Sequence, residues 1–202
     1  NGKQHSAPEM FDDELRAVVE AAHALDLKVG AHAHGTASIR AAIRAGVDSV
    51  DHSTWLDEET IDMYLEHGTY IVRTGYLQEY FLTLDTMPAD TREQRIENKA
   101  KIEVELRKAI QRGVNMAMGT DAGVMPHGDN AKEFGYYVRM GMTPMQAIET
   151  GTINAAALLG MEDEIGHLDV GMAADIIATD ESPLDDIAML ENVTFVMKDG
   201  VI

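Results

Sequence analysis

The sequence predicts an α/β fold whose strands form a parallel sheet. Apolar segments with helical periodicity alternate with short apolar runs typical of buried strands, and this alternation indicates repeated strand–helix units. Four such units can be counted along the chain. Because a closed (β/α)8 barrel needs eight units in about 250 residues, the chain would form either half of a barrel or a small open sheet.

The expected elements have recognisable starts and ends. Residues 6–9 and 143–146 have the pattern of capping boxes, which begin helices. Asp57 is an expected N-cap, and the glycines at 46, 68 and 113 are expected to end helices. We expect strands at 27–33, 47–52, 69–74 and 114–121, and helices at 6–25, 38–45, 58–67, 90–112, about 131–140 and about 144–160.

Two loops are expected beside the strand ends. Residues 75–88 contain three aromatic side chains and exceed the usual length of about 2–6 residues for a loop between a strand and a helix, so we expect a functional loop or a lid. Residues 123–130 contain glycine and proline and follow the fourth strand.

The last part of the chain has a different character. Residues 174–179 and 193–198 are short strand-like runs, and Asp199-Gly200 is a hairpin signal. We predict that residues 1–164 belong to the barrel-like part, and that residues 165–202 form a separate small β element.

Charge and composition narrow the classes of function. Lys and Arg number 16 against 35 Asp and Glu, which gives a formal charge of −19. This charge disfavours binding to nucleic acid or to an anionic membrane surface, and no apolar run approaches the roughly 18 residues of a membrane span. Without cysteine, a transition-metal site must use histidine, carboxylate or modified lysine. The cellular compartment stays open.

Three of the expected strands end in a residue that can bind a metal. These residues are His32, His52 and Asp121. The carboxyl ends of barrel strands converge on one face, where active sites lie, and two imidazoles with a carboxylate suit zinc or a similar divalent ion. Each residue also has a structural interpretation, as a hydrogen-bonded histidine or a turn aspartate. The combination favours a metal site.

Four further residues are candidates for substrate binding. Arg73 ends the third strand, where a cation suits an anionic substrate group. If the strand continued in alternation, His34 would point away from His32, but Gly35 indicates that the chain already turns there. His34 would then either contact substrate or cap the turn. His127 lies in the loop after Asp121, where a substrate role and a loop role are equally compatible with the sequence. The candidates are Arg73, His127, His34 and Tyr76.

Several motifs resemble one known group of enzymes. The segments GAHAHG (30–35), VDHS (50–53) and GTDAG (119–123) resemble strands five, six and eight of the amidohydrolase superfamily. The similarity continues through PHGDN (126–130), GMTPMQAI (141–148), TINAA (152–156) and GMAADI (171–176). Together they resemble the branch of Xaa-Pro or Xaa-Arg dipeptidases and carboxypeptidases, near imidazolonepropionase.

The resemblance implies a fold and a role for each strand-end residue. The chain would be the C-terminal half of a TIM-type barrel, strands five to eight, with its tail forming part of a small β-sandwich. His32 and His52 would bind the second metal of a binuclear zinc pair, although other divalent metals are compatible. Asp121 would bind the first metal and act as general base, so that Asp121 and His52 would be the catalytic residues. The metals would activate water and polarise the carbonyl that is attacked.

The family features expected from the first half of the barrel are missing. There is no His-x-His pair for strand one, because His32 and His34 fit strand five. The carboxylated lysine of strand four is absent as well, and Lys3 and Lys28 fit that role poorly. The simplest hypothesis is a fragment, a cleavage product or a split protein whose partner is the N-terminal half of the barrel. A homo-oligomer is also expected.

Three functions remain open at this point. The leading one is hydrolysis of the amide bond next to a C-terminal amino acid, in a dipeptide or an N-acyl amino acid, with Arg73 or His127 holding the substrate carboxylate. The second is a cyclic-amide hydrolase or deaminase of the same superfamily, although His34 and Gly35 stand where deaminases carry an acidic residue. The third is a catalytically incomplete domain or assembly partner.

Overall fold

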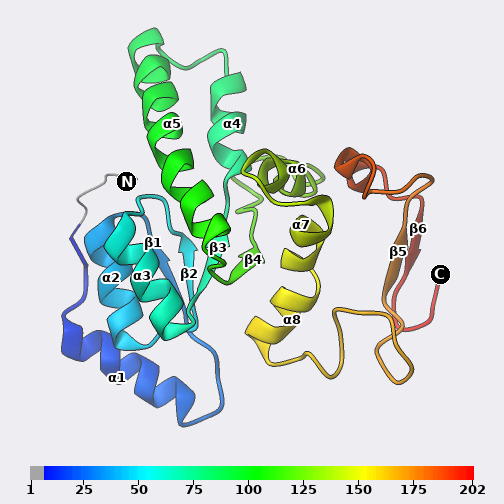
Figure 1. Ribbon diagram of the computed structural model, residues 1–202, viewed down its shortest axis with the longest axis horizontal. Helices are drawn as coiled ribbons and strands as arrows, with labels where there is room; N and C mark the ends of the chain where they lie inside the picture. Colours follow the sequence, from blue (N-terminus) through cyan, green and yellow to red (C-terminus); the bar gives the residue numbers. More distant parts are fainter. Residues whose placement is uncertain (1–6) are drawn as a thin grey trace.

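A four-stranded parallel sheet forms the centre of the molecule. The computed structural model describes residues 7–202, so the expected cap at Ser6 lies outside the described residues. The sheet consists of β1 (Gly30–Ala33), β2 (Ser49–His52), β3 (Tyr70–Arg73) and β4 (Met116–Met118), paired in chain order (Figure 1). The register pairs Ala33 with His52 and Arg73 with Met118, so the carboxyl ends of the strands lie along one edge. The predicted parallel α/β arrangement is confirmed.

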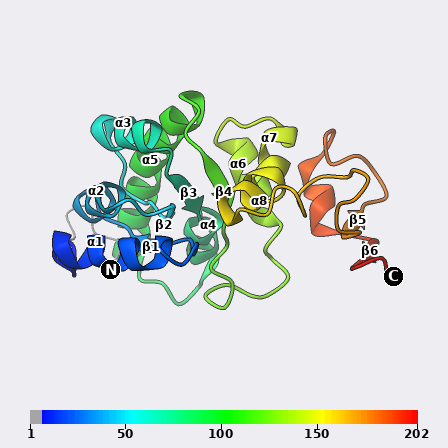
Figure 2. The same ribbon diagram turned by 90° about the horizontal axis from the view of Figure 1, so that it is seen from below.

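Helices cover one face of this sheet and bury its apolar side chains. They include α1 (Asp12–His23), α2 (Thr36–Ala45), α3 (Glu58–His67) and α5 (Ala89–Gln111), and the expected helices at 38–45, 58–67 and 90–112 are confirmed (Figures 1 and 2). The core includes Ile39, Ile43, Val50, Ile61, Ile71, Leu106 and Met116. Gly46, Gly68 and Gly113 end three of the helices with positive φ, a conformation that glycine adopts without a steric penalty. Among the described residues, no helix combines the length and the apolar character that crossing a membrane requires.

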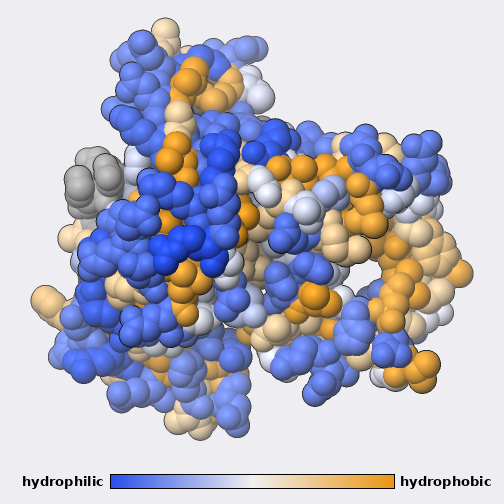
Figure 3. Space-filling view, viewed as in Figure 1, coloured by the Kyte–Doolittle hydropathy of each residue, from blue (hydrophilic) through white to orange (hydrophobic). Residues whose placement is uncertain are grey.

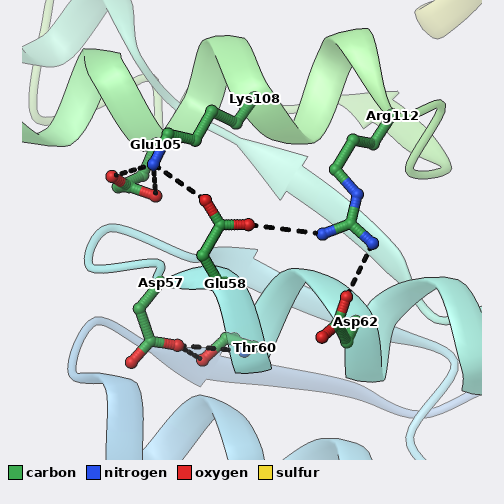
Figure 4. A network of polar contacts seen from close by, with 7 residues as sticks. All are labelled: Asp57, Glu58, Thr60, Asp62, Glu105, Lys108 and Arg112. Carbon is green, nitrogen blue, oxygen red and sulfur yellow. Dashed lines mark hydrogen bonds and ion pairs between the residues drawn. The ribbon is translucent and has the colours of Figure 1, made fainter.

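Ion pairs hold the C-terminal half of α5 against α3. Lys108 Nζ lies 2.9 Å from a carboxylate oxygen of Glu58, and Arg112 Nη2 lies 2.6 Å from Asp62 Oδ1 (Figure 4). These side chains are largely exposed, so each pair contributes little to stability by itself. Glu58 contacts both Lys108 and Arg112, so the pairs form one connected network.

Within residues 7–202, no helix packs over the other face of the sheet at β1 to β3. The register places His32, Asp51 and Val72 in one row across neighbouring strands, and these side chains are exposed or half-buried. A groove of about 550 Å³ also runs beside β1, which is an edge strand. Its lining includes the apolar residues Leu15, Val18, Val19, Val29 and Ala31. An uncovered sheet face and an apolar groove at a free edge are surfaces that folded proteins ordinarily bury.

The tail forms a second, two-stranded sheet. Strands β5 (Ile176–Ala178) and β6 (Phe195–Met197) pair antiparallel, and a tight turn at Asp199-Gly200 follows β6, as expected. Hydrophobic surface gathers over this pair (Figure 3), where Ile177 and Val196 are 57% and 58% exposed. The division into domains at residue 164 stays a prediction.

Three expected boundaries are wrong. The expected loop 75–88 contains a helix, α4 (Tyr76–Thr83), whose first amides are bound by the distant Glu133 and not by a local cap. The expected helix 144–160 is two helices, α7 (Pro144–Thr150) and α8 (Ile153–Leu159). They are separated at Gly151, where a Cβ would lie 2.8 Å from the Phe134 ring. The first described helix begins at Asp12, and the amide of Phe11 donates to Glu14.

Removing the N-cap of α3 is expected to lower the free energy of unfolding by about 1–2 kcal/mol. Asp57 accepts hydrogen bonds from the amide of Thr60 at 2.9 Å and from Arg40 at 2.6 Å, so Asp57→Ala removes both. Glu59→Ala is the matched control, because it removes only an exposed ion pair with Arg40 and should cost about 0.5 kcal/mol or less. Urea denaturation measures both variants, and equal losses would contradict the capping role.

Candidate metal centre

Three histidines meet at the carboxyl ends of β1 and β2. His32 lies in β1, His34 just after it, and His52 ends β2. The imidazole centroids of His32 and His52 are 4.6 Å apart, those of His34 and His52 are 4.5 Å apart, and one ligand nitrogen from each ring lies within 4.8 Å of the others. Within the part of the chain that the structure describes, this three-histidine group is the one cluster of potential ligands close enough to share a metal ion.

His34 belongs to this group, contrary to the expectation that strand alternation would point it away from His32. The two rings are 4.8 Å apart and nearly perpendicular. The physical reason is the period of the β-strand: side chains two residues apart lie on the same face. The sequence pattern His-x-His therefore already places both imidazoles on one side.

Two threonine hydroxyls orient the imidazoles. His34 Nδ1 lies 2.8 Å from Thr54 Oγ1, and His52 Nδ1 lies 2.8 Å from Thr74 Oγ1. When Nδ1–H donates to the hydroxyl oxygen, Nε2 keeps its lone pair for a metal. Each threonine comes from the strand end next to that of its histidine, so the orientation depends on the sheet.

The electrostatics keep two of these imidazoles neutral. Burial, followed by the charges of His52 and His32, lowers the pKa of His34 to about 4. Burial and the neighbouring His32 also lower the pKa of His52, although Asp121 acts in the opposite direction. A neutral imidazole is the form that binds a metal, so these rings are available as ligands at neutral pH.

The backbone is strained at two predicted site residues. His52 has a φ of 67° and Asp121 a φ of 55°, and Ser53, next to His52, has a φ of 44°. Such conformations cost on the order of 1–3 kcal/mol in residues other than glycine and concentrate at functional sites. At β2 the strain is held by the Ser53 amide, which donates to the Ala33 carbonyl at 3.1 Å, and by the Ser53 hydroxyl, which lies 2.5 Å from the Tyr64 hydroxyl.

Asp121 lies near the three-histidine group without being part of it. Its charge acts on the pKa values of both His52 and Asp51. Asp51 is a neighbour that the sequence analysis missed. It is half-buried on the open face beside His32, and burial together with Asp121 raises its pKa. The sheet register pairs Asp51 with His32, and this pairing identifies Asp51 as a neighbour of the three-histidine group.

Arg73 ends β3, as predicted, but its side chain is buried. Its side chain is 2% exposed, and its guanidinium donates to the His52 carbonyl at 2.6 Å. The β-strand period directs it to the helix-covered side of β3, where it supports the backbone of His52. Its role in substrate binding stays a prediction, which this burial does not favour.

The remaining substrate candidates lie on two different segments. Tyr76 begins α4, is half-buried against the core, and has Lys132 Nζ 5.5 Å from its ring centroid. His127 is exposed on the loop between β4 and α6 (Lys132–Arg139). Their contact with a substrate stays a prediction.

Sequence and structure comparisons all relate this chain to amidohydrolases. The model of the amidohydrolase family matches residues 1–202. A solved Xaa-Pro dipeptidase with methionine bound in its active site superposes with a TM-score of 0.87 at 40% identity over 100% of this chain. The ochratoxinase of Aspergillus niger is 37% identical over 196 residues, and its crystal structure superposes with a TM-score of 0.85. Imidazolonepropionase of Symbiobacterium thermophilum is 28% identical over 172 residues.

The chain spans about half the length of the proteins it matches, or less. It covers 51% of the dipeptidase chain, 40% of the ochratoxinase sequence and 36% of the imidazolonepropionase sequence. The four-stranded parallel sheet therefore aligns with about half of each larger α/β structure.

The metal-free chain is expected to lose stability as the pH falls from about 6.5 to about 4. His34 binds a proton at a lower pH in the folded chain than in the unfolded chain, so its contribution is present above pH 6.5 and disappears on acidification. His34→Gln should remove this part of the slope of unfolding free energy against pH. The exposed His127→Gln is the control, and identical slopes for wild type and His34→Gln would contradict the assignment.

Proposed function

Because this chain belongs to the amidohydrolase family, we propose that it is the metal-binding half of a hydrolase that cleaves the amide bond next to a C-terminal amino acid. The observation that carries the proposal is the three-histidine group at the strand ends, with two rings kept neutral and oriented by threonines. The similarity to an Xaa-Pro dipeptidase with bound methionine supports a substrate that ends in an amino acid, such as a dipeptide or an N-acyl amino acid.

His32, His34 and His52 would hold a divalent metal ion. Their donor set is all imidazole nitrogen, which suits zinc and related ions. When bound, such an ion lowers the pKa of a water ligand and polarises a carbonyl oxygen. His34, a candidate for substrate contact from the sequence, would be the third ligand, because one of its ring nitrogens lies within 4.8 Å of those of His32 and His52.

Asp121 would act as the general base and acid of the reaction. Its carboxylate lies on an exposed segment just beyond β4, close enough to influence the pKa of His52. In this position it would take a proton from the attacking water and deliver it to the leaving amine. The positive φ of Asp121 supports a functional reason for its placement.

The substrate would enter from the side where the loops leave the sheet. With Arg73 buried, His127 and Tyr76 are the remaining candidates for contact with the substrate. His127 is exposed, so its imidazole is accessible to a substrate carboxylate. This assignment needs no rearrangement of the core.

We further propose that a complementary barrel half covers the open side of this chain. Three surfaces support it: the unpaired edge of β1 with its apolar groove, the uncovered row His32–Asp51–Val72, and the apolar tail pair β5–β6. A two-stranded sheet is only marginally stable alone, so the tail would be completed as a β-sandwich. This half would supply the ligands for a second metal, as in the binuclear arrangement expected from the sequence.

Ring opening of a cyclic amide is the second candidate function. The similarity to imidazolonepropionase favours it, at 28% identity. Parallel assays of a dipeptide panel and of cyclic amides, with the complementary half present, separate the two activities. Turnover of cyclic amides without turnover of dipeptides would overturn the leading proposal.

The isolated chain is expected to bind one zinc or cobalt ion through the three-histidine group. Isothermal titration with each metal should give a stoichiometry near one for wild type, and His52→Ala should lower the affinity at least tenfold, because it removes one of three ligands. Asp121→Asn is the matched control and should change the affinity less, since Asp121 lies outside the group. Absence of metal binding by wild type would overturn the metal centre.

In the completed barrel, Asp121→Asn is expected to lower kcat by about 10²–10⁴-fold, the usual contribution of a general acid–base residue. KM should change less, because the carboxylate acts on protons and not on substrate affinity. Steady-state kinetics on a dipeptide measure both constants. An unchanged kcat would exclude Asp121 as the general base.

A further inference from the structure

A buried carboxylate outside the three-histidine group makes two backbone hydrogen bonds. Glu133 lies in α6, and its side chain has no solvent exposure. One carboxylate oxygen accepts the amide of Gly75 at 2.7 Å, and the other accepts the amide of Tyr76 at 2.8 Å. Glu133 therefore caps the first turn of α4 from another part of the chain, and both of its oxygens are used.

The two residues just before the capped turn contact His52. Thr74, the residue before Gly75, has its hydroxyl 2.8 Å from His52 Nδ1. Arg73, one residue earlier, donates to the His52 carbonyl at 2.6 Å. Thr74 thus contacts the ring of His52 and Arg73 its backbone. Glu133 in turn binds the amide of Gly75, the next residue of the same segment.

The segment 73–75 packs closely against α6. A Cβ on Gly75 would lie 1.9 Å from the Tyr136 ring, so the backbone of Gly75 packs directly against α6. The Tyr137 hydroxyl also donates to the Arg73 carbonyl at 2.8 Å. A displacement of α6 would therefore be transmitted to the segment 73–75 and to the imidazole that it orients.

Retaining a charged group here has an energetic cost. Burial raises the pKa of Glu133 to about 7, against the opposing effects of the two amides and of Arg73. A buried carboxylate is destabilising unless its hydrogen bonds compensate. The two amide hydrogen bonds offset part of this cost, and they fix the backbone of Gly75 and Tyr76.

We propose that Glu133 is a positioning residue that fixes the imidazole of His52 through Gly75 and Thr74, and thereby sets the metal affinity of the three-histidine group. The proposal rests on the proposed function, because it assumes that this group binds a metal. The orientation of His52 by Glu133 can be measured on its own, in the metal-free chain.

The test is a double-mutant cycle on zinc affinity, measured by competition with a chromophoric chelator. Glu133→Gln retains only one acceptor oxygen and should lower the affinity about 10–100-fold, the usual effect of losing a residue that supports a ligand. Thr74→Val should cause a similar loss, and the double variant should lose little more, since both act through one path. Thr74→Ser should restore the wild-type affinity.

Thr54→Val is the matched control, because Thr54 supports His34 and not His52. The loss of zinc affinity in Thr54→Val should add to the loss in Glu133→Gln. Additive losses for Glu133→Gln and Thr74→Val, or a Glu133→Gln affinity within twofold of wild type, would overturn the proposal. If Glu133→Gln does not fold, Glu133→Asp replaces it in the same cycle, because it keeps the charge and shortens the side chain.

A second measurement separates this proposal from the metal centre itself. Long-range ¹H–¹⁵N spectra of the metal-free chain report the tautomer of each imidazole. His52 should hold one tautomer in wild type and a mixture in Glu133→Gln, with His34 unchanged. If wild type binds no zinc, the proposed function fails, and the spectra still decide the orienting role: an unchanged His52 signal overturns it.

Discussion

The parallel pairing of four strands in chain order is the constraint on which the site depends. Because every strand runs the same way, each chain segment leaves the sheet at the same edge, and the residues at those exits become neighbours. His52 and Asp121 adopt positive φ at two of these exits, where the backbone must turn sharply from the strand. Parallel pairing therefore brings residues that are distant in sequence together at one edge of the sheet.

The two faces of the sheet give adjacent side chains different environments. At the end of β3 the strand period turns Arg73 inward, where it is 2% exposed among the helices, whereas His32 in β1 lies on the uncovered face. Burial is the largest cause of the lowered pKa values of His34 and His52, ahead of the charges of the neighbouring histidines and of Arg73. The helix-covered side forms the buried core, and the uncovered side carries the proposed metal centre.

Support for the three-histidine group comes from neighbouring strands and from the helix layer. The hydroxyls of Thr54 and Thr74 each meet an imidazole that belongs to the adjacent strand end. Behind Thr74, Glu133 binds the first amides of α4. This helix replaced the loop expected at 75–88, since its cap comes from a residue 58 positions away in sequence. Local structure and site geometry thus depend on the same long-range contacts.

The sequence by itself determined the elements whose signals are local. Asp57 with Gly68, and Thr143 with Gln146, mark helix ends through caps and turns formed by nearby residues, and the alternation of helix and strand was sufficient for a parallel sheet. It also identified His32, His52 and Asp121 as strand-end residues, although their roles as ligands stay a proposal. Only the tertiary structure decided that His34 joins the histidines, that Asp51 lies beside His32, and that Arg73 is buried. These facts depend on register and on which face of a strand is covered, and both are set by contacts between segments far apart in the chain.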